Sequence, residues 1–233
     1  MAFPLVTTAA RQARVLEVAG HRPWPVPGWP WSVAQTLVDA VSCHWRVVPE
    51  ALAPYLPAGV EPDLHGGQAW LTIAALRVTG LRLRGMLAVP RLSDGAELAV
   101  RAAVSVADRP AARARIRIAR TGVAVRVEAS RTRPGGAPAV FHAGFEATGP
   151  AAAAAPGSLE AFLHERYLLV AGRPDGGLVL AEQHRPPWRL APAQARVELE
   201  TIAPPGLARG VPALAHIAEP LDQLVWAPER QEA

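Results

Sequence analysis

The chain has 233 residues, half of them hydrophobic, so it can form a sizeable core and is not expected to be disordered. Its formal net charge is only +4, and all 24 Lys+Arg positions are arginine. Because arginine stays protonated in proteins, no side chain can supply the neutral amine that a Schiff-base nucleophile needs. The one cysteine, Cys43, excludes an intrachain disulfide and predicts a cytoplasmic setting.

The first 20 residues are expected to be an N-terminal extension. They lack the basic start and apolar run of a signal peptide. No apolar run approaches the roughly 20 residues of a membrane span, so no membrane association is predicted. The alanine run at residues 151–155 is interpreted as a linker. With no internal repeat and no second core, residues 21–233 are predicted to form a single domain.

The N-terminal half predicts an extended arm followed by strands. Residues 21–31 contain four prolines, which exclude a helix, and Trp24, Trp29 and Trp31 would hold this arm in place. Patterning then predicts strands at residues 32–48, 68–79 and 97–107, a short helix at 49–56, and a loop at 80–95 that carries Arg82, Arg84 and Arg91.

Residues 113–133 show the clearest local pattern. Charged and apolar side chains alternate on both sides of Thr121-Gly122, which predicts a β-hairpin. Arg113, Arg115 and Arg117 share one strand face, as either an anion or RNA surface or a solvated edge that discourages aggregation. Stacking aromatic residues are absent from this face, so we favour the solvated edge and expect no nucleic-acid binding.

The C-terminal half predicts more strands and one helix. Ser158 is placed to cap a helix at residues 157–163. Strands are expected at residues 139–147, 167–170 and 178–182, residues 191–200 fit either helix or strand, and the last strand ends near Trp226. Many short strands with few helices indicate a mainly β (α+β) fold, an antiparallel β-barrel or sandwich.

Several standard sites are absent from the sequence. There is no phosphate loop, no nucleophile elbow and no His or Cys pair with metal-ligand spacing, so neither a cofactor nor a metal site is predicted. Cys43 and His44 would point to opposite faces of a strand, which makes them a poor catalytic pair. Cys43 is therefore expected to be a small core residue.

Two groups of residues could carry chemistry. Glu97 and Arg101 lie four apart in a predicted strand and so share a face. They would form either a charge pair inside a cavity, which orients a carboxylate ligand, or an exposed ion pair, which the spacing alone favours. Arg166 and Tyr167 enter a strand after a helix, where side chains can converge on a pocket mouth. His184 precedes a rigid Pro-Pro-Trp, and a structural role fits these last three residues equally well.

A series of motifs in fixed order resembles a known family. The motifs are His21-Arg22-Pro23-Trp24-Pro25, Trp31 with Gln35-Thr36, His44-Trp45, Pro57-Ala58-Gly59-Val60, Ala69-Trp70-Leu71, Arg77-Val78-Thr79-Gly80, Glu97-Leu98-Ala99-Val100-Arg101, Gly157-Ser158-Leu159-Glu160-Ala161-Phe162-Leu163, Glu165-Arg166-Tyr167 and His184-Arg185-Pro186-Pro187-Trp188. From about residue 21 to Arg230 the chain resembles the YqjF-like family of uncharacterised bacterial proteins, which looks like a branch of the acetoacetate-decarboxylase-like superfamily. The resemblance implies a β-barrel-like fold with a central cavity. In the decarboxylases, this cavity holds a lysine that forms a Schiff base with a β-keto acid.

The chain departs from the family pattern in two places. Ala99 stands where the family motif usually has Asn. By comparison with the family pattern, the chain also lacks a segment normally found between Arg109-Pro110 and the strand near Arg113. By analogy, that segment contains the turn at which the decarboxylases place their lysine.

These observations predict a cytoplasmic protein that binds a small carboxylate- or carbonyl-bearing molecule in a barrel cavity and is not a lysine Schiff-base decarboxylase. The candidate ligand-binding residues are Gln35, Glu97, Arg101, Arg166, Tyr167 and His184. Catalysis stays open, with Glu97 or His184 as the candidate general acid/base. The alternative is a non-catalytic binding or assembly protein that forms a homodimer through a shortened barrel edge.

Overall fold

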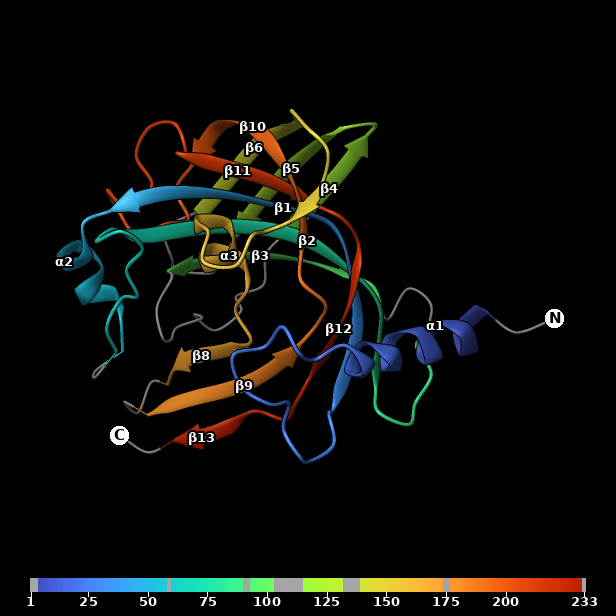
Figure 1. Ribbon diagram of the computed structural model, residues 1–233. Helices are drawn as coiled ribbons and strands as arrows, with labels where there is room; N and C mark the ends of the chain where they lie inside the picture. The colour runs from blue at the N-terminus through green and yellow to red at the C-terminus, as the bar shows by residue number, and fades with distance from the viewer. Residues whose placement is uncertain are drawn as a thin grey trace.

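The computed structural model describes residues 4–57, 60–89, 93–102, 115–131, 139–173 and 177–231. Antiparallel strands dominate these residues, and the helices are few and short, as the sequence predicts (Figure 1). The centre of the fold is the long pair β1 (Val33–Val47) and β2 (Ala69–Leu83). The prediction of a loop from residue 80 is wrong for residues 80–83, because β2 continues to Leu83. Gly80, with φ +59°, lies where the β1–β2 register shifts, and this bulge lets the strand continue.

Two arms of the sheet diverge from the same edge of β1. One edge of β1 pairs with β11 (Leu214–Ala218) near its C-terminal end and with β12 (Leu221–Val225) near its N-terminal end. The first arm continues through β10 (Arg189–Glu200), β6 (Ala139–Ala147), β5 (Ala124–Arg131) and β4 (Arg115–Thr121), and the second through β9 (Leu178–His184) to β8 (Leu168–Gly172) and β13 (Glu229–Gln231). On the far side, β3 (Gly95–Ala102) pairs with β2. The two arms therefore lie on either side of the central strands (Figure 1).

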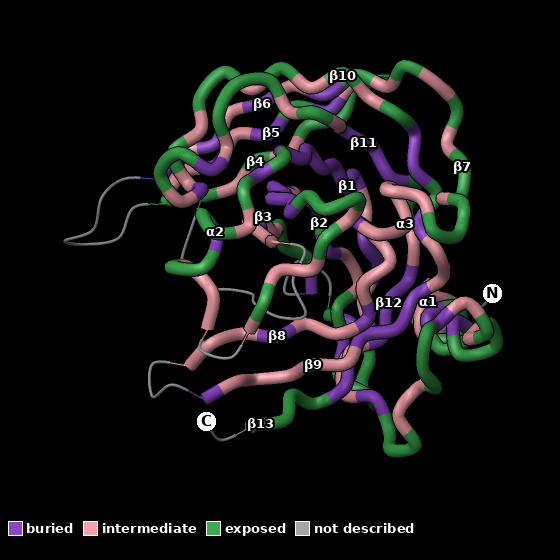
Figure 2. Tube along the Cα trace, turned by 60° about the vertical axis from the view of Figure 1, so that its left-hand side comes forward, coloured by how far each residue is buried: buried purple, intermediate pink, exposed green. Residues whose placement is uncertain are grey.

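The sheet curls strongly but does not close. Strand β4, at the end of the first arm, comes into contact with β3, yet no backbone ladder joins these two strands in the described part of the chain. The prediction of a mainly β, antiparallel architecture is thus confirmed. The sheet of the described residues does not close into a barrel. Buried residues gather along β1, β11 and β12, whereas β13 is exposed (Figure 2).

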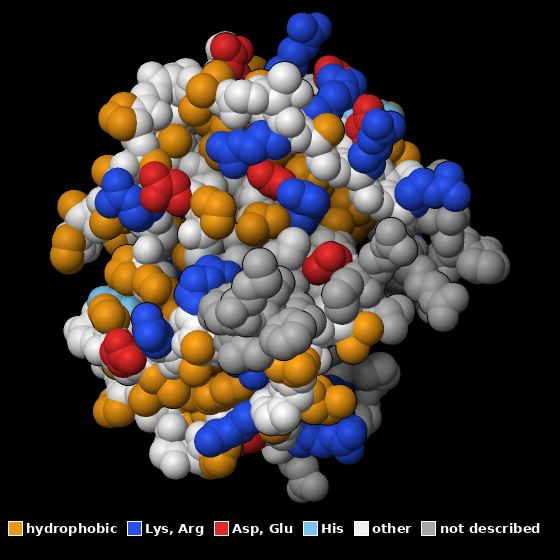
Figure 3. Space-filling view, turned by 90° about the vertical axis from the view of Figure 1, so that its right-hand side faces the viewer, with side chains coloured by type: hydrophobic (Ala, Val, Ile, Leu, Met, Phe, Trp, Pro, Cys, Tyr) orange, Lys and Arg blue, Asp and Glu red, His pale blue; other side chains and the backbone are white. Residues whose placement is uncertain are grey.

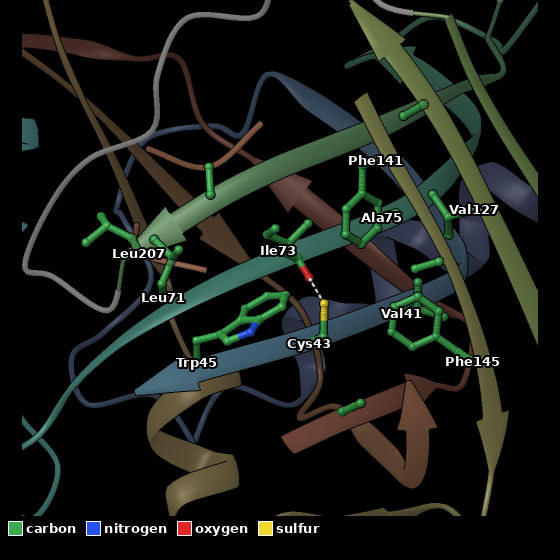
Figure 4. Packing of buried hydrophobic residues seen from close by; sticks show 14 of the residues in the cluster. Val41, Cys43, Trp45, Leu71, Ile73, Ala75, Val127, Phe141, Phe145 and Leu207 are labelled. Carbon is green, nitrogen blue, oxygen red and sulfur yellow. Dashed lines mark hydrogen bonds between the residues drawn. The ribbon is translucent and has the colours of Figure 1, made fainter. Parts of the chain in front are cut away.

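The main hydrophobic core fills the concave side of the first arm. Cys43 points into this core beside Ile73, and Phe141 and Phe145 enter it from β6 (Figure 4). The Cys43 thiol is fully buried and donates a hydrogen bond to the Ile73 carbonyl oxygen. Burial raises the pKa of this thiol. The prediction that Cys43 is a core residue is confirmed, and His44 occupies the opposite face of β1.

The N-terminal extension contains helices that the sequence patterns did not predict. It forms α1 (Pro4–Ala13) and η1 (Arg14–Glu17), and Gln12 is fully buried. The Gln12 amide bonds to the Gly80 carbonyl oxygen at the bulge, and its oxygen accepts from Arg82. Of the three tryptophans in the arm, Trp31 is buried, while Trp24 and Trp29 remain well exposed. The extension therefore packs onto the sheet instead of lying apart from it.

Other expectations about individual elements have mixed outcomes. The short helix appears as α2 (Pro49–Leu52) followed by η2 (Ala53–Tyr55), and the expected hairpin as β4 and β5. The alanine run is not a plain linker, because its β7 (Ala152–Ala153) pairs with β10. Residues 191–200 are strand, and the additional strand β13 follows Trp226. Arg91, Arg113, residues 103–107 and the site of the missing segment lie outside the described residues.

The distribution of arginine on the surface is mixed. Arg115 and Arg117 are exposed on β4, the last strand of its arm. On the face shown in Figure 3, basic side chains are scattered and several adjoin acidic ones. They form no continuous stripe on this face of the kind that nucleic-acid binding favours. No helix within the described ranges is long and apolar enough to cross a membrane.

Candidate functional site

A cavity of about 440 Å³ lies between the central strands and the second arm. One wall comes from β1, β2 and β3, the opposite wall from β8 and β9, and α3 (Leu159–His164) contributes its C-terminal end. Helix α3 begins where the sequence predicts, because the Ser158 hydroxyl caps it by accepting from the Ala161 N–H. The polar lining residues are Gln35, Ser42, Thr72, Glu97, Arg101, His164, Arg166, Gln183, Arg185 and Gln223.

Strand register determines which side chains form the first wall. In the β2–β3 pairing, Thr72 lies opposite Arg101, and in the β1–β2 pairing it lies opposite His44. Directly opposed residues of antiparallel strands share a face, so these three side chains form one row across the wall. The next row contains Ala99, where the family motif usually has Asn, and this substitution makes the middle of the wall apolar.

Glu97 and Arg101 form an ion pair on this wall. An Arg101 guanidinium nitrogen lies 2.9 Å from a Glu97 carboxylate oxygen, and both residues line the cavity. Their side chains keep 43% and 36% of their surface exposed, which screens the attraction and makes the pair worth little for stability. The Arg101 Nε is nevertheless buried and has no hydrogen-bond partner among the described residues.

Two further arginines reach the cavity, and each is held by a carboxylate behind it. An Arg166 guanidinium nitrogen lies 2.6 Å from an Asp63 carboxylate oxygen. Arg185, which the sequence reasoning missed as a candidate, is almost fully buried and lies 2.9 Å from Glu165. Burial lowers the pKa of the Arg185 guanidinium, while Glu165 opposes this shift. The second pair is a buried and fully bonded structural unit.

Tyr167 and His184 are not in the cavity lining. The buried Tyr167 hydroxyl donates to Glu165, and burial followed by this hydrogen bond raises the pKa of the tyrosine. His184 is fully buried between the His21 ring and the Val15 carbonyl oxygen, to which its Nε2 donates at 2.8 Å. Both therefore support the scaffold around the site, whereas Gln35, Glu97 and Arg101 face the cavity.

A row of glutamines connects the two walls, from Gln35 on β1 through Gln223 on β12 to Gln183 on β9. Gln35 donates to Gln223 at 2.7 Å, Gln223 donates to Gln183, and Gln183 donates to the Arg166 carbonyl oxygen at 2.9 Å. Of these three glutamines, only Gln35 was predicted from the sequence to bind a ligand. Gln183 and Gln223 could have been noticed as polar residues inside apolar strands. Only the strand pairing shows that Gln35 and Gln223 lie opposite each other.

Three histidines from distant parts of the chain also meet beside the cavity. His44, His164 and His216 each place a ring nitrogen within 4.8 Å of those of the other two. They are far apart in sequence, so the local spacing that led to the prediction of no metal site could not reveal them. Among the described residues, these are the side chains able to hold a metal ion together.

The antiparallel, curled sheet and the cavity beside it define the structural class, and comparison with known proteins agrees with it. Residues 34–111 and 98–222 match DUF2071, described as an uncharacterized conserved protein, so the chain belongs to this family. It is also 26% identical over 229 residues to the uncharacterized protein YqjF of Bacillus subtilis (strain 168), covering 86% of this chain and 93% of that protein. The family resemblance inferred from the motifs is confirmed.

Solved structures with this fold are similar in shape and distant in sequence. An acetoacetate decarboxylase-like enzyme from Sphingomonas wittichii RW1 has a TM-score of 0.56 at 15% identity, covering 92% of this chain and 99% of that one. The enduracididine biosynthesis enzyme MppR has a TM-score of 0.53 at 13% identity, covering 87% and 90%. Acetoacetate decarboxylase from Legionella pneumophila has a TM-score of 0.50 at 11% identity, covering 91% and 93%. These likenesses show the fold alone.

Proposed function

We propose that this is a cytoplasmic protein that binds a small carboxylate- or carbonyl-bearing molecule in its cavity, without lysine chemistry. The observation that carries the proposal is the Arg101 Nε, a buried N–H donor in the cavity lining that has no acceptor among the described residues. A buried donor without a partner costs about 1–3 kcal/mol, which a ligand oxygen would recover.

The geometry around Arg101 suits a carboxylate. Glu97 accepts from the terminal nitrogen Nη2, whose second N–H bond is parallel to the Nε–H, so Nε–H and this N–H form the edge open to a ligand. An arginine that presents two parallel N–H groups recognises the two oxygens of a carboxylate better than any other side chain does. Glu97 then holds the guanidinium in position.

The remaining lining accounts for a small ligand with a further polar group. A cavity of about 440 Å³ lies within the range of small-molecule sites. Apolar residues line much of the wall, while Gln35, Gln183 and Gln223 offer neutral amide groups that can bond a carbonyl or hydroxyl. MppR, which shares the fold at a TM-score of 0.52, has been solved in complex with pyruvate, a small keto acid.

Within this proposal, Glu97 is the lining residue suited to proton transfer, and Arg101 holds the ligand carboxylate. His184, fully buried and outside the lining, is better suited to a structural role. The chain has no lysine, so a reaction through a lysine Schiff base is excluded by composition. The exposed charges of Arg115 and Arg117 on β4 disfavour edge-to-edge pairing, so ligand binding is preferred over assembly through that edge.

Thermal unfolding with pyruvate and acetoacetate tests the proposal. A ligand present at about 100 times its Kd stabilises the folded state by about 2.7 kcal/mol, which raises the Tm by several degrees. Arg101→Gln should abolish the increase. The matched control is Arg189→Gln, which removes an exposed arginine paired with Glu219 and should leave the increase intact. No stabilisation by any small carboxylate, or equal stabilisation of Arg101→Gln, would rule the proposal out.

A further inference from the structure

The three-histidine cluster is built from elements that the fold holds firmly together. His44 lies on β1, His216 on the neighbouring β11, and His164 is the last residue of α3. Ser42 is the cross-strand partner of His216 and lies on the same face of β1 as His44. His44 and His216 are buried, while His164 lines the cavity together with Ser42 and Thr72.

The hydrogen bonds assign the proton on each of two rings. The His164 Nδ1 lies 3.0 Å from the Glu160 carbonyl oxygen, which can only accept, so Nδ1 carries the proton and Nε2 is a bare acceptor. The Ser42 hydroxyl, 2.9 Å from that Nε2, must donate to it. The His44 Nε2, 3.1 Å from the same hydroxyl, then donates to Ser42, and the Thr72 hydroxyl donates to the His44 Nδ1 at 2.8 Å.

We infer that His44, His164 and His216 form a binding site for a divalent transition-metal ion, Zn²⁺ above all, with an open coordination position toward the cavity. Three neutral imidazoles and one exchangeable position are the ligand set of many zinc sites that bind a small molecule. The His216 Nδ1 is buried with no hydrogen-bond partner in the described part of the chain. Coordination of a metal ion would give this otherwise unsatisfied ring a binding partner.

The dimensions of the cluster fit such an ion after a small adjustment. Zinc–nitrogen bonds of about 2.0–2.1 Å in a tetrahedral site separate the ligand nitrogens by about 3.3 Å. From separations of at most 4.8 Å, each nitrogen needs to move inward by less than about 1 Å. A change of the Ser42 χ1 rotamer would move its Oγ away from the two Nε2 atoms and leave this space to the ion.

The surrounding groups already hold one ring as metal sites do, and a change of tautomer prepares a second ring. The Glu160 carbonyl oxygen holds the His164 Nδ1–H, which leaves Nε2 free for the ion. On the other ring, moving the His44 proton to Nδ1 makes Thr72 the acceptor and frees Nε2 for the ion. Burial lowers the pKa of all three rings, that of His164 to about 3, so they are in the neutral form that binds metals.

An anion completes the charge balance. Arg185 disfavours positive charge at His164, although it is itself paired with Glu165. A hydroxide ion in the open coordination position would reduce the charge that the divalent metal ion adds, and no further protein ligand is needed for this. A ligand carboxylate or carbonyl oxygen would replace it, and this last step alone rests on the proposed function.

Metal titrations of the full chain test the inference without any organic ligand. Metal-free protein is titrated with Zn²⁺ by calorimetry and with Co²⁺ by visible absorption. We expect one ion per chain and the intense visible bands of tetrahedral Co²⁺. His164→Gln and His216→Gln should each weaken binding by more than the roughly 10–100-fold that loss of an outer-shell partner costs. Ser42→Ala should bind at least as tightly as the wild type, because no hydroxyl competes for the Nε2 atoms.

The control is His142→Gln, on β6 and outside the cluster, which should bind the ion unchanged. Circular dichroism of the metal-free variants confirms that they are folded. The inference is overturned if the wild type binds neither ion up to millimolar concentration, or if the cluster variants bind as the wild type does. Metal binding that persists when pyruvate and acetoacetate fail to stabilise the protein would contradict only the proposed function.

Discussion

Arg101 on β3 lies directly across from Thr72 on β2, whose other cross-strand neighbour is His44 on β1. One row of the cavity wall therefore has Arg101, the proposed hydrogen-bond donor to a ligand carboxylate, at one end and a ring of the histidine cluster at the other. Strand β2 lies between Arg101 and His44, so their backbones are two strand spacings, about 9.5 Å, apart on the same face.

Thr72→Val should destabilise the metal-free protein by about 1–3 kcal/mol, because it preserves shape and leaves the buried His44 Nδ1 without its hydrogen-bond partner. Thr72→Ser keeps the hydroxyl and should lose less. Urea denaturation followed by fluorescence measures both. A Thr72→Val variant as stable as the wild type would show that this hydroxyl does not hold the ring.

Glu165→Gln should cost about 3–5 kcal/mol, because it leaves the buried Arg185 guanidinium without its counter-charge. Glu219→Gln is the matched control. It removes the partner of the exposed Arg189 and should cost about 1 kcal/mol or less. Equal losses of unfolding free energy in the two variants would contradict the structural role given to Arg185.

His184 should make the protein sensitive to acid. Burial lowers the pKa of its ring below the ordinary 6.5, so the unfolded chain takes up a proton at a pH where the folded protein does not. The wild type therefore loses stability as the pH falls below 6.5, by up to about 1.4 kcal/mol per pH unit for this one group.

The His184→Gln variant keeps a donor for the Val15 carbonyl oxygen and cannot titrate. Its unfolding free energy should fall less steeply between pH 7 and pH 5 than that of the wild type, as urea titrations at each pH would show. Parallel curves for the two proteins would mean that His184 is not held neutral in the fold.

Cys43 should be unreactive in the folded protein. Its thiol is fully buried, and its pKa is raised by burial first and by Glu200 second, so almost no thiolate forms near neutral pH. A thiol reagent should label the protein only as fast as it unfolds, and at once in concentrated urea. Because the chain has one cysteine, any fast labelling of the native protein would contradict this burial directly.

Local patterns predicted the local structure well. Alternation around Gly122 located the hairpin, and Ser158 located the start of α3. The same reasoning stopped β2 too early, because a glycine that usually ends a strand here forms a bulge. The N-terminal helix was missed because its contact with Arg82 is a tertiary interaction.

The site was predictable only in part, for a physical reason. Glu97 and Arg101 share a strand, so their spacing revealed that they share a face. Gln183 and Gln223 come together with Gln35 only through the pairing of strands far apart in sequence. The histidine cluster depends on the same long-range register, which sequence spacing does not contain.

In the proposed site, Arg101 binds a small carboxylate inside the cavity. The most direct measurement is a crystal structure of the protein soaked with pyruvate at high concentration. A carboxylate is expected within hydrogen-bond distance of the Arg101 Nε, with Glu97 still paired to the guanidinium. An empty cavity in well-resolved density, or pyruvate bound only at the surface, would contradict it.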